Sequence, residues 1–213
     1  MRRERRTRAK QTPMPNDPLL VHACCAPCLA ALLEWLRSRT GPSTAFFCNP
    51  NIHPLIEFRR RLKACHVLAD QERLPLVADD AYGLETFLDA LGAERARPDR
   101  CRHCYAMRLE AAARYAAEHR FPRFTSTLLV SPQQDRDLVC ELGHAAARRH
   151  AIAFDDTDHR ALHERGIEIA RCRQLYRQQY CGCIFSEYDR YRDTKEHVYR
   201  PVSPPAAEMM GIP

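Results

Sequence analysis

Short apolar runs alternate along the chain with longer segments whose apolar residues recur at helical spacing. Apolar runs bounded by turn residues predict strands, and leucines or alanines three and four positions apart predict helices. The predicted strands are 19–23, 44–48, 76–78, 124–130 and 152–154. The predicted helices are 29–39, 54–72, 83–91, 104–118, 132–150 and 161–178, with a polar loop over 92–100.

The order of these elements predicts the fold class. Strands that alternate with amphipathic helices form parallel βαβ units, because each helix returns the chain to the same end of the sheet. We therefore expect a single α/β domain over residues 19–199, with a mostly parallel sheet and helices on both faces. Residues 1–18, which are basic, and the proline-rich residues 200–213 are expected to be irregular tails.

The first ten residues hold most of the net charge. The whole chain carries +6, and its first ten residues contain six basic side chains and one acidic one, a net of +5. The rest of the chain is therefore close to neutral, although basic residues cluster at 59–63 and 95–108. A basic tail is either a solvated, disordered extension or a flexible arm for a phosphate backbone.

The segment after the basic tail does not fit a secretion signal. Prolines and Asp17 interrupt it, and residues 19–21 are its one continuous apolar stretch before the first cysteines. That stretch is far shorter than the apolar region of a signal peptide. The window 19–36 also contains charged and proline residues, which disfavours a membrane span. We therefore expect a cytoplasmic protein with reduced thiols and no membrane partner.

Eleven cysteines in 213 residues are the most unusual feature of the composition. An odd number cannot pair completely, and a chain of this length builds a core without disulfide staples. Seven cysteines are grouped and four are isolated. The grouped ones are Cys24, Cys25, Cys28, Cys101, Cys104, Cys181 and Cys183, and the isolated ones are Cys48, Cys65, Cys140 and Cys172. We interpret the isolated four as ordinary buried thiols and the groups as a metal and redox centre.

Two of the groups have the spacing of metal ligands. Cys101 and Cys104 form a CxxC at a predicted loop-to-helix junction, where helix amides favour anions. Cys24 and Cys25 directly follow the first predicted strand, where α/β sheets bind ligands. Together these four thiols complete the ligand set of a tetrahedral zinc ion or of an iron-sulfur cluster. Adjacent cysteines favour the cluster, and structural zinc is the alternative.

The segment Cys25-Ala26-Pro27-Cys28 allows a different interpretation. A CxPC sequence after a strand and at the start of a helix is locally similar to the thioredoxin active site, where the helix N-terminus lowers the pKa of the first thiol. A thioredoxin-like oxidoreductase is therefore an alternative. It does not explain Cys24 or the CxxC further along the chain.

Cys181-Gly182-Cys183 places two thiols one residue apart. A disulfide between them closes a very small ring, so it is strained and easily reduced, which suits electron transfer better than a structural role. The alternative, two metal ligands or two idle thiols, stays open.

Five ordered motifs resemble one family, the QueH-type epoxyqueuosine reductases. They are LVHACCAPC at 20–28, NPNIHP at 49–54, CRHCYAMRL at 101–109, TSTLLVSP at 125–132 and YRQQYCGC at 176–183. The resemblance covers about residues 19–188 and leaves both tails outside.

The resemblance implies a fold similar to the nucleotide alpha-hydrolases, which is Rossmann-like. It also implies the reduction of epoxyqueuosine to queuosine at wobble position 34 of a tRNA with a GUN anticodon, without cobalamin and with an electron donor that the sequence does not identify. Because no glycine-rich phosphate loop is visible, we expect no ATP.

The resemblance assigns roles to the grouped cysteines. It implies that Cys24, Cys25, Cys101 and Cys104 hold a 4Fe-4S cluster, that Cys181 and Cys183 form a redox-active disulfide, and that an additional iron ion lies beside the cluster. Cys28 stands where many relatives have Asp, so it is the candidate ligand of that iron, with a purely structural role as the alternative.

Polar, aromatic and basic residues near these cysteines are candidate substrate contacts. Hydrogen bonds to the modified base are expected from Asn49, Asn51, Ser126 and Thr127, stacking from His103 and Tyr105, and phosphate contacts from Arg100, Arg102 and Arg108. A solvated helix face is the alternative for the basic residues. A metal-stabilised RNA-binding module without catalysis is a further alternative function, although it does not call for the CxC pair.

Overall fold

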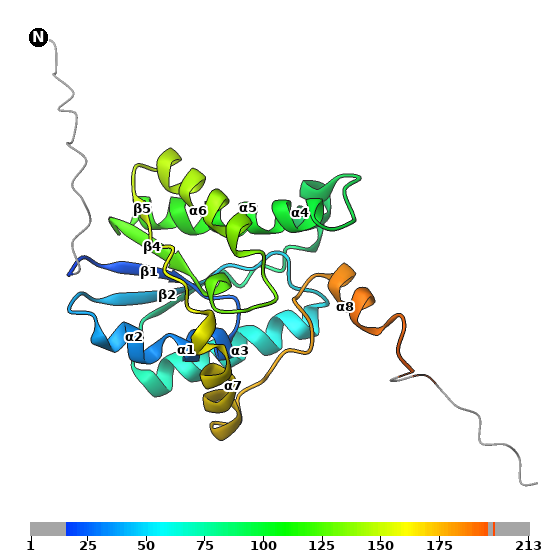
Figure 1. The fold of residues 1–213 in the computed structure, drawn as a ribbon, viewed down its shortest axis with the longest axis horizontal. Helices are drawn as coiled ribbons and strands as arrows, with labels where there is room; N and C mark the ends of the chain where they lie inside the picture. Colours follow the sequence, from blue (N-terminus) through cyan, green and yellow to red (C-terminus); the bar gives the residue numbers. More distant parts are fainter. Residues whose placement is uncertain (1–15, 196–197, 199–213) are drawn as a thin grey trace, which may run out of the picture.

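A five-stranded, fully parallel sheet forms the centre of the molecule (Figure 1). The computed structural model describes residues 16–195 and 198, so the predicted tails lie almost entirely outside the described residues. The strand order is β3-β2-β1-β4-β5. The strands are β1 (Leu19–His22), β2 (Ser43–Phe47), β3 (Leu76–Ala78), β4 (Arg123–Ser126) and β5 (Ala153–Phe154). The predicted α/β class and parallel sheet are confirmed.

Helices cover both faces of the sheet, with α1, α3 and α7 on one face and α5 and α6 on the other (Figure 1). The helices are α1 (Ala26–Ala31), α2 (Leu33–Ser38), α3 (Leu55–Glu72), α4 (Leu84–Leu91), α5 (Asp99–Glu118), α6 (Arg136–Arg149), α7 (His163–Cys172) and α8 (Ile184–Tyr191). Two short 3-10 helices lie at Thr127–Leu129 and Arg160–Leu162.

Strand β1 lies at the middle of the sheet and is buried on both faces. Leu19 and Val21 belong to the apolar core under α1 and α3, whereas Leu20 belongs to the core under α5 and α6. Side chains of a strand alternate between faces, so a strand covered on both sides is apolar throughout. This explains why the run 19–21 has no polar interruption.

The chain leaves β1 towards β2 on one side and later reaches β4 on the other, which makes the carboxyl end of β1 a topological switch point. In open parallel sheets the loops at such a point diverge and leave a crevice for a ligand. The first cysteines follow β1 directly. The backbone N–H of Cys24 donates to Oγ1 of Thr127, which follows β4, at 2.9 Å. The two loops of the switch point therefore meet at Cys24.

Several predicted boundaries are wrong because a local cap begins or ends the element. The helix predicted at 29–39 is two helices, and the first begins earlier, with Pro27 in its first turn. The strand predicted at 124–130 ends at Ser126. The Ser126 side chain accepts the N–H of Leu128 at 3.1 Å and so starts a 3-10 turn.

Three further differences concern helices. The loop predicted at 92–100 ends two residues early, so Cys101 lies inside the first turn of α5 rather than before it. The helix predicted at 161–178 ends at Cys172, and α6 begins only after its cap, Asp135. Helix α8 follows the CxC and was not predicted.

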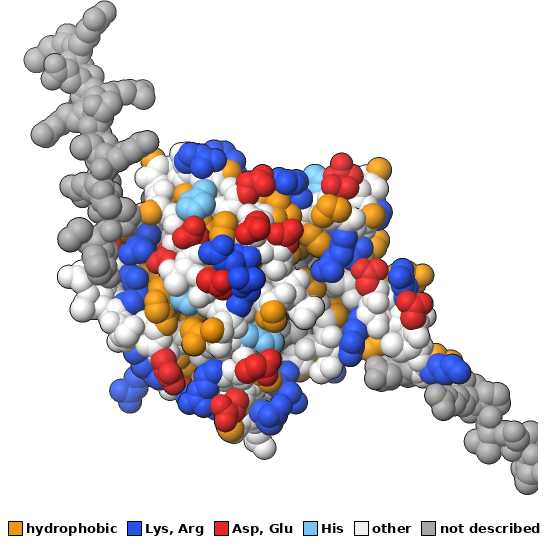
Figure 2. Space-filling view, viewed as in Figure 1, with side chains coloured by type: hydrophobic (Ala, Val, Ile, Leu, Met, Phe, Trp, Pro, Cys, Tyr) orange, Lys and Arg blue, Asp and Glu red, His pale blue; other side chains and the backbone are white. Residues whose placement is uncertain are grey.

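The surface of the described residues mixes both signs of charge. Figure 2 shows acidic and basic side chains interspersed over one face of the molecule, without a large region of a single sign. In the part of the chain that the structure describes, no helix is both long and apolar enough to cross a bilayer.

Candidate metal and redox centre

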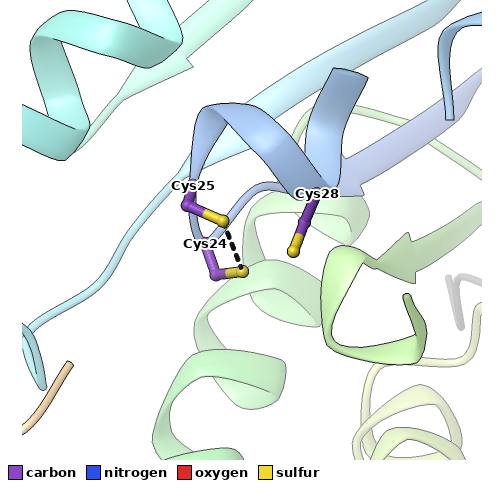
Figure 3. A group of neighbouring side chains, drawn as sticks. All are labelled: Cys24, Cys25 and Cys28. Atoms are coloured by element: carbon purple, nitrogen blue, oxygen red, sulfur yellow. Dashed lines mark hydrogen bonds between the residues drawn. The ribbon is translucent and has the colours of Figure 1, made fainter. Parts of the chain in front are cut away.

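Three thiols converge at the carboxyl end of β1 (Figure 3). Cys24 follows the strand, Cys25 is the extended N-cap of α1, and Cys28 lies in the first turn. Residues three apart at a helix start share a face, so Cys25 and Cys28 point the same way. Their sulfurs and that of Cys24 all lie within 4.8 Å of one another, and those of Cys24 and Cys25 are 3.7 Å apart.

The three thiols shift one another's pKa values in opposite directions. Hydrogen bonding from Cys25, and then from Cys28, holds the pKa of Cys24 well below its usual range, against burial that raises it. The same contact with Cys24 raises the pKa of Cys25 to about 12, and it also raises the pKa of Cys28. Cys24 is therefore the thiol of the group that loses its proton most readily.

Two side chains outside the group bind its sulfurs. Thr127 Oγ1 donates to Cys24 Sγ at 3.1 Å. Gln178, just before the CxC, donates its Nε2 to Cys25 Sγ at 3.0 Å. The switch-point loop and the CxC segment thus contact the same thiol group.

Cys101 and Cys104 lie in the first turns of α5, and Arg108 contacts Cys104. Arg108 is buried, and it donates from Nε to the Cys104 carbonyl at 3.0 Å and from Nη2 to Cys104 Sγ at 3.1 Å. Burial lowers the pKa of Arg108, but the neighbouring Cys104, Cys181 and Cys24 thiols outweigh it and raise the pKa. This guanidinium is therefore the positive charge shared by three cysteine segments.

His22, at the end of β1, is fully buried beside the thiols. Its Nδ1 lies 2.8 Å from Ser126 Oγ and its Nε2 lies 3.3 Å from the Cys48 carbonyl. Because a carbonyl only accepts, Nε2 carries the proton and Nδ1 accepts from the serine. Burial, followed by the charge of Arg108, lowers the pKa of His22 to about 4, so the ring is neutral.

Cys181 and Cys183 are both free thiols in this structure and lie near α5. Cys183 is buried against Phe87 and Cys104. Cys181 Sγ accepts a hydrogen bond from Gln134 Nε2 at 3.5 Å. The pair therefore lies on the same side of the molecule as the CxxC.

Most of the candidate base contacts already have protein partners. Asn49 donates to the Ala23 carbonyl at 2.9 Å, and Tyr105 donates to Gln134 Oε1 at 2.9 Å. Ser126 and Thr127 bind His22 and Cys24, as described above. Asn51, like Asn49, is 1% exposed. It differs in that neither Oδ1 nor Nδ2 has a hydrogen-bond partner among the described residues, whereas in Asn49 only Oδ1 lacks one.

The basic residues of the CxxC segment are also engaged. Arg100 is buried and forms an ion pair with Asp189 of α8. Arg102 is exposed and pairs with Glu141 of α6 at 2.8 Å. His103 pairs with Glu94. Arg102 and His103 are thus the members of this segment that present polar groups to solvent, whereas Arg108 lies among the sulfurs.

The isolated cysteines behave mostly as predicted. Cys48 and Cys65 are buried and Cys140 is half-buried. The prediction is wrong for Cys172, which is exposed. Cys172 is the last residue of α7.

Sequence reasoning did not single out three residues that hold the centre together: Gln134, Gln178 and Arg61. Gln178 belongs to the YRQQYCGC motif, so the motif itself carried a signal for it. Arg61 belongs to the basic run 59–63, which predicted a surface patch. In the structure its side chain is 2% exposed and its guanidinium is bound to the CxC loop.

The donor set fits a thiolate-bound metal group. Within the described part of the chain, Cys24, Cys25 and Cys28 are the one set of three or more ligand side chains whose donor atoms all lie within 4.8 Å of one another. Soft thiolates select zinc or iron-sulfur clusters. Cys101 and Cys104 are outside this set and approach it through Arg108. The fold and this centre define an α/β protein with a cysteine-lined metal site at its switch point.

Comparison with known proteins identifies the family. A sequence profile described as epoxyqueuosine reductase QueH matches residues 19–189, and the chain belongs to that family of oxidoreductases. The epoxyqueuosine reductase QueH of Dehalococcoides mccartyi is 36% identical over 81% of this chain and 94% of its own length. That of Histophilus somni is 35% identical over 84% of this chain and 76% of its own.

A solved structure shares the fold. It is the U34-tRNA thiolase NcsA from Methanococcus maripaludis with its [4Fe-4S] cluster, which is 13% identical with a TM-score of 0.50. The alignment covers 80% of this chain and 61% of that one. At this identity the likeness concerns the fold, and it agrees with the Rossmann-like class predicted above.

Proposed function

We propose that this protein reduces epoxyqueuosine to queuosine at wobble position 34 of a tRNA with a GUN anticodon. The observation that carries the proposal is the convergence of Cys24, Cys25 and Cys28 at the switch point of a QueH-family chain. A free dithiol, Cys181 and Cys183, lies near the same centre. The proposed functional unit is residues 19–199. Because its proposed substrate is a tRNA, we infer that the protein acts in the cytoplasm.

Cys24, Cys25, Cys101 and Cys104 are the proposed ligands of a 4Fe-4S cluster, and Cys28 is the proposed ligand of an additional iron. The lowered pKa of Cys24 supports its role as a thiolate ligand. When bound, the iron centre supplies a Lewis acid for the departing oxygen and a path for electrons. Arg108 compensates the negative charge of the thiolates from the interior.

The CxC dithiol supplies the electrons in this proposal. Removing the epoxide oxygen breaks two C–O bonds, forms one C=C bond and consumes two electrons and two protons. Two thiols provide both when Cys181 and Cys183 become a disulfide, and the oxygen leaves as water. An electron donor that remains to be identified then reduces the disulfide.

The buried carboxamide of Asn51 is the proposed contact to the modified base, because a donor and an acceptor without protein partners suit a base edge. Asn49, Tyr105, Ser126 and Thr127 act on the substrate indirectly, through the loops that they hold. Arg108 acts through the metal centre.

We infer that neither cobalamin nor ATP takes part. The loop after β1, where Rossmann-like proteins carry a glycine-rich phosphate loop, is here the cysteine segment itself. Family membership likewise argues against the thioredoxin-like alternative and against an RNA-binding module without catalysis.

Anaerobic incubation with epoxyqueuosine-containing tRNA and a chemical reductant, followed by mass analysis of the nucleosides, tests the proposal. We expect queuosine to form without added cobalamin or ATP. Persistence of the epoxide with a protein that carries its full iron and sulfide content contradicts the proposed activity.

A further inference from the structure

Arg61 binds the backbone of the CxC loop from inside the protein. It lies on α3, and its Nη1 donates to the Cys181 carbonyl at 2.8 Å while its Nη2 donates to the Tyr180 carbonyl at 2.9 Å. Its Nε donates to Oε1 of Glu57, one helical turn earlier, at 2.6 Å. The other carboxylate oxygen of Glu57 accepts the hydroxyl of Tyr176. A chain of three side chains thus ends on two consecutive carbonyls of the loop.

The remaining two carbonyls of residues 180–183 are also bound. The carbonyl of Gly182 accepts the backbone N–H of His53 at 2.8 Å. The carbonyl of Cys183 accepts the hydroxyl of Ser186 at 2.7 Å. Every carbonyl of this loop therefore has a protein donor while both cysteines are free thiols.

The backbone conformation and close packing at position 182 favour glycine. Its φ of +149° is rare for residues with a side chain, and a Cβ atom there lies 3.3 Å from Nη1 of Arg61 and 3.4 Å from Nδ2 of Asn51. The guanidinium and the glycine thus pack directly against each other.

The cost of burying Arg61 suggests that it has a role beyond packing. A guanidinium that is 2% exposed requires partners for its donors, and an apolar side chain at such a site is often equally stable. Its partners here are one carboxylate and the loop. The neighbours Arg59 and Arg60 on the same helix are exposed and contact neither carbonyl.

The segment held by Arg61 touches both parts of the centre. Gln178 binds Cys25 of the three-thiol group at 3.0 Å, and Cys181 accepts from Gln134 near α5. The carbonyls that Arg61 holds belong to Cys181 itself and to the residue before it. A shift of the Tyr180–Cys181 backbone therefore moves the redox pair relative to the metal ligands.

We propose that Arg61, held by Glu57 and Tyr176, is a positioning residue for the CxC pair, which stabilises its dithiol form and keeps the two sulfurs directed towards the metal centre. This inference rests on the proposed function, in which the pair is the electron source. Arg61 does not touch the reacting atoms. It acts through the backbone of Tyr180 and Cys181.

Thermodynamic linkage predicts the direction in which loss of Arg61 shifts the dithiol–disulfide equilibrium of the CxC pair. The four carbonyl bonds are formed with both thiols free. A disulfide in the very small CxC ring is strained, and in the proposed coupling its closure moves the backbone of 181–183 away from these donors. An interaction made in only one of two states shifts the equilibrium towards that state. Loss of the Arg61 bonds therefore favours the disulfide.

The test measures this equilibrium directly. Full-length holoprotein is equilibrated in glutathione buffers, in which two protein thiols and oxidised glutathione exchange to give the CxC disulfide and two reduced glutathione molecules. Acid quenching, alkylation and mass analysis then give the oxidised fraction. The variants are Arg61→Met, Arg61→Lys and Tyr176→Phe, with Arg59→Met as the matched control on the exposed face of α3.

We expect Arg61→Met to raise the equilibrium constant for disulfide formation at least tenfold and to lower kcat with KM unchanged, since the buried guanidinium cannot reach tRNA. Arg61→Lys, which can serve one carbonyl, is expected to be intermediate, and Arg59→Met to match the wild type. If Arg61→Met does not fold, Arg61→Lys and Tyr176→Phe give the same direction of shift. A lowered Tm with an unchanged disulfide equilibrium, or a shift towards the dithiol, overturns the proposal.

A failure of the proposed function can be distinguished from a failure of the Arg61 inference. If wild-type protein leaves epoxyqueuosine intact, the proposed activity fails whatever Arg61 does. The glutathione titration still reports whether Arg61 controls the CxC pair, because it needs no tRNA.

Discussion

Nη2 of Arg108 lies 3.1 Å from Sγ of Cys104, one helical turn earlier on α5. Both residues are buried, so this positive charge and this thiol face each other away from solvent. Residues that contact metal ligands without binding the metal typically change its affinity by roughly 10- to 100-fold. Arg108 is therefore expected to stabilise the bound metal group.

Arg108→Met is expected to lower the affinity for the iron centre by roughly tenfold or more, because it leaves buried thiolates without their counter-charge. The measurement is the rate at which a chelator removes iron from the anaerobically purified protein. Arg114→Met, which changes an exposed arginine of the same helix, is the control. Equal rates of iron loss for Arg108→Met and the control contradict the assignment.

Cys28 and Cys104 are expected to differ in their effect on bound iron. Cys28→Ser removes the additional iron, about one equivalent by the proposed ligand scheme, and leaves the visible absorption of the cluster, whereas Cys104→Ser bleaches it. Iron and sulfide analysis of both variants separates these outcomes, with Cys140→Ser as the control. The sulfur of Cys28 lies within 4.8 Å of those of Cys24 and Cys25, so bleaching by Cys28→Ser is the result that would make it a cluster ligand.

Thr127 is expected to matter through its hydroxyl. Thr127→Val leaves the N–H of Cys24 without its acceptor and should lower the free energy of unfolding by about 1–2 kcal/mol. Thr127→Ser keeps the hydroxyl and removes one buried methyl group, which should cost about 0.8 kcal/mol. Denaturant titration compares the two variants, and a loss for Thr127→Val no larger than the loss for Thr127→Ser would contradict the role of the hydroxyl.

His159 should make the stability of the protein depend on pH. Burial lowers its pKa in the folded state, where the ring packs against Trp35 at 4.5 Å. A lowered folded pKa means that full stability is present above the unfolded value of about 6.5 and is lost as the pH falls below it. His159→Phe removes this contribution.

The check is the difference in unfolding free energy between wild type and His159→Phe at pH 7.5 and at pH 5.5. We expect the variant to gain relative to the wild type at the lower pH. A difference that does not change with pH would mean that the pKa of His159 is the same in the folded and the unfolded protein.

The sequence predicted the sheet because short runs with apolar residues alternate along the chain with helical segments that have one apolar face. It could not predict α8, because Ile184–Tyr191 is short and rich in polar residues. That helix is anchored by contacts distant in sequence, such as the ion pair of Arg100 with Asp189. Local patterns carry no information about such partners.

The candidate site shows the same limit. Motif spacing predicted that Cys24, Cys25 and Cys28 belong to a metal or redox site, and the turn into α1 places them together. The burial of Arg61 and Arg108 was not predictable, because an arginine on an amphipathic helix is ordinarily solvated. Only the fold shows that carbonyls and sulfurs surround them.

A single turnover without added reductant tests most directly whether the Cys181 and Cys183 dithiol supplies the electrons. Protein that has been reduced and freed of reductant is mixed anaerobically with excess epoxyqueuosine-containing tRNA, and queuosine and the Cys181–Cys183 disulfide are both quantified by mass analysis. We expect one queuosine and one disulfide per active protein molecule, and no product from Cys181→Ser or Cys183→Ser with an intact cluster. Queuosine formed while both cysteines remain thiols would contradict this expectation.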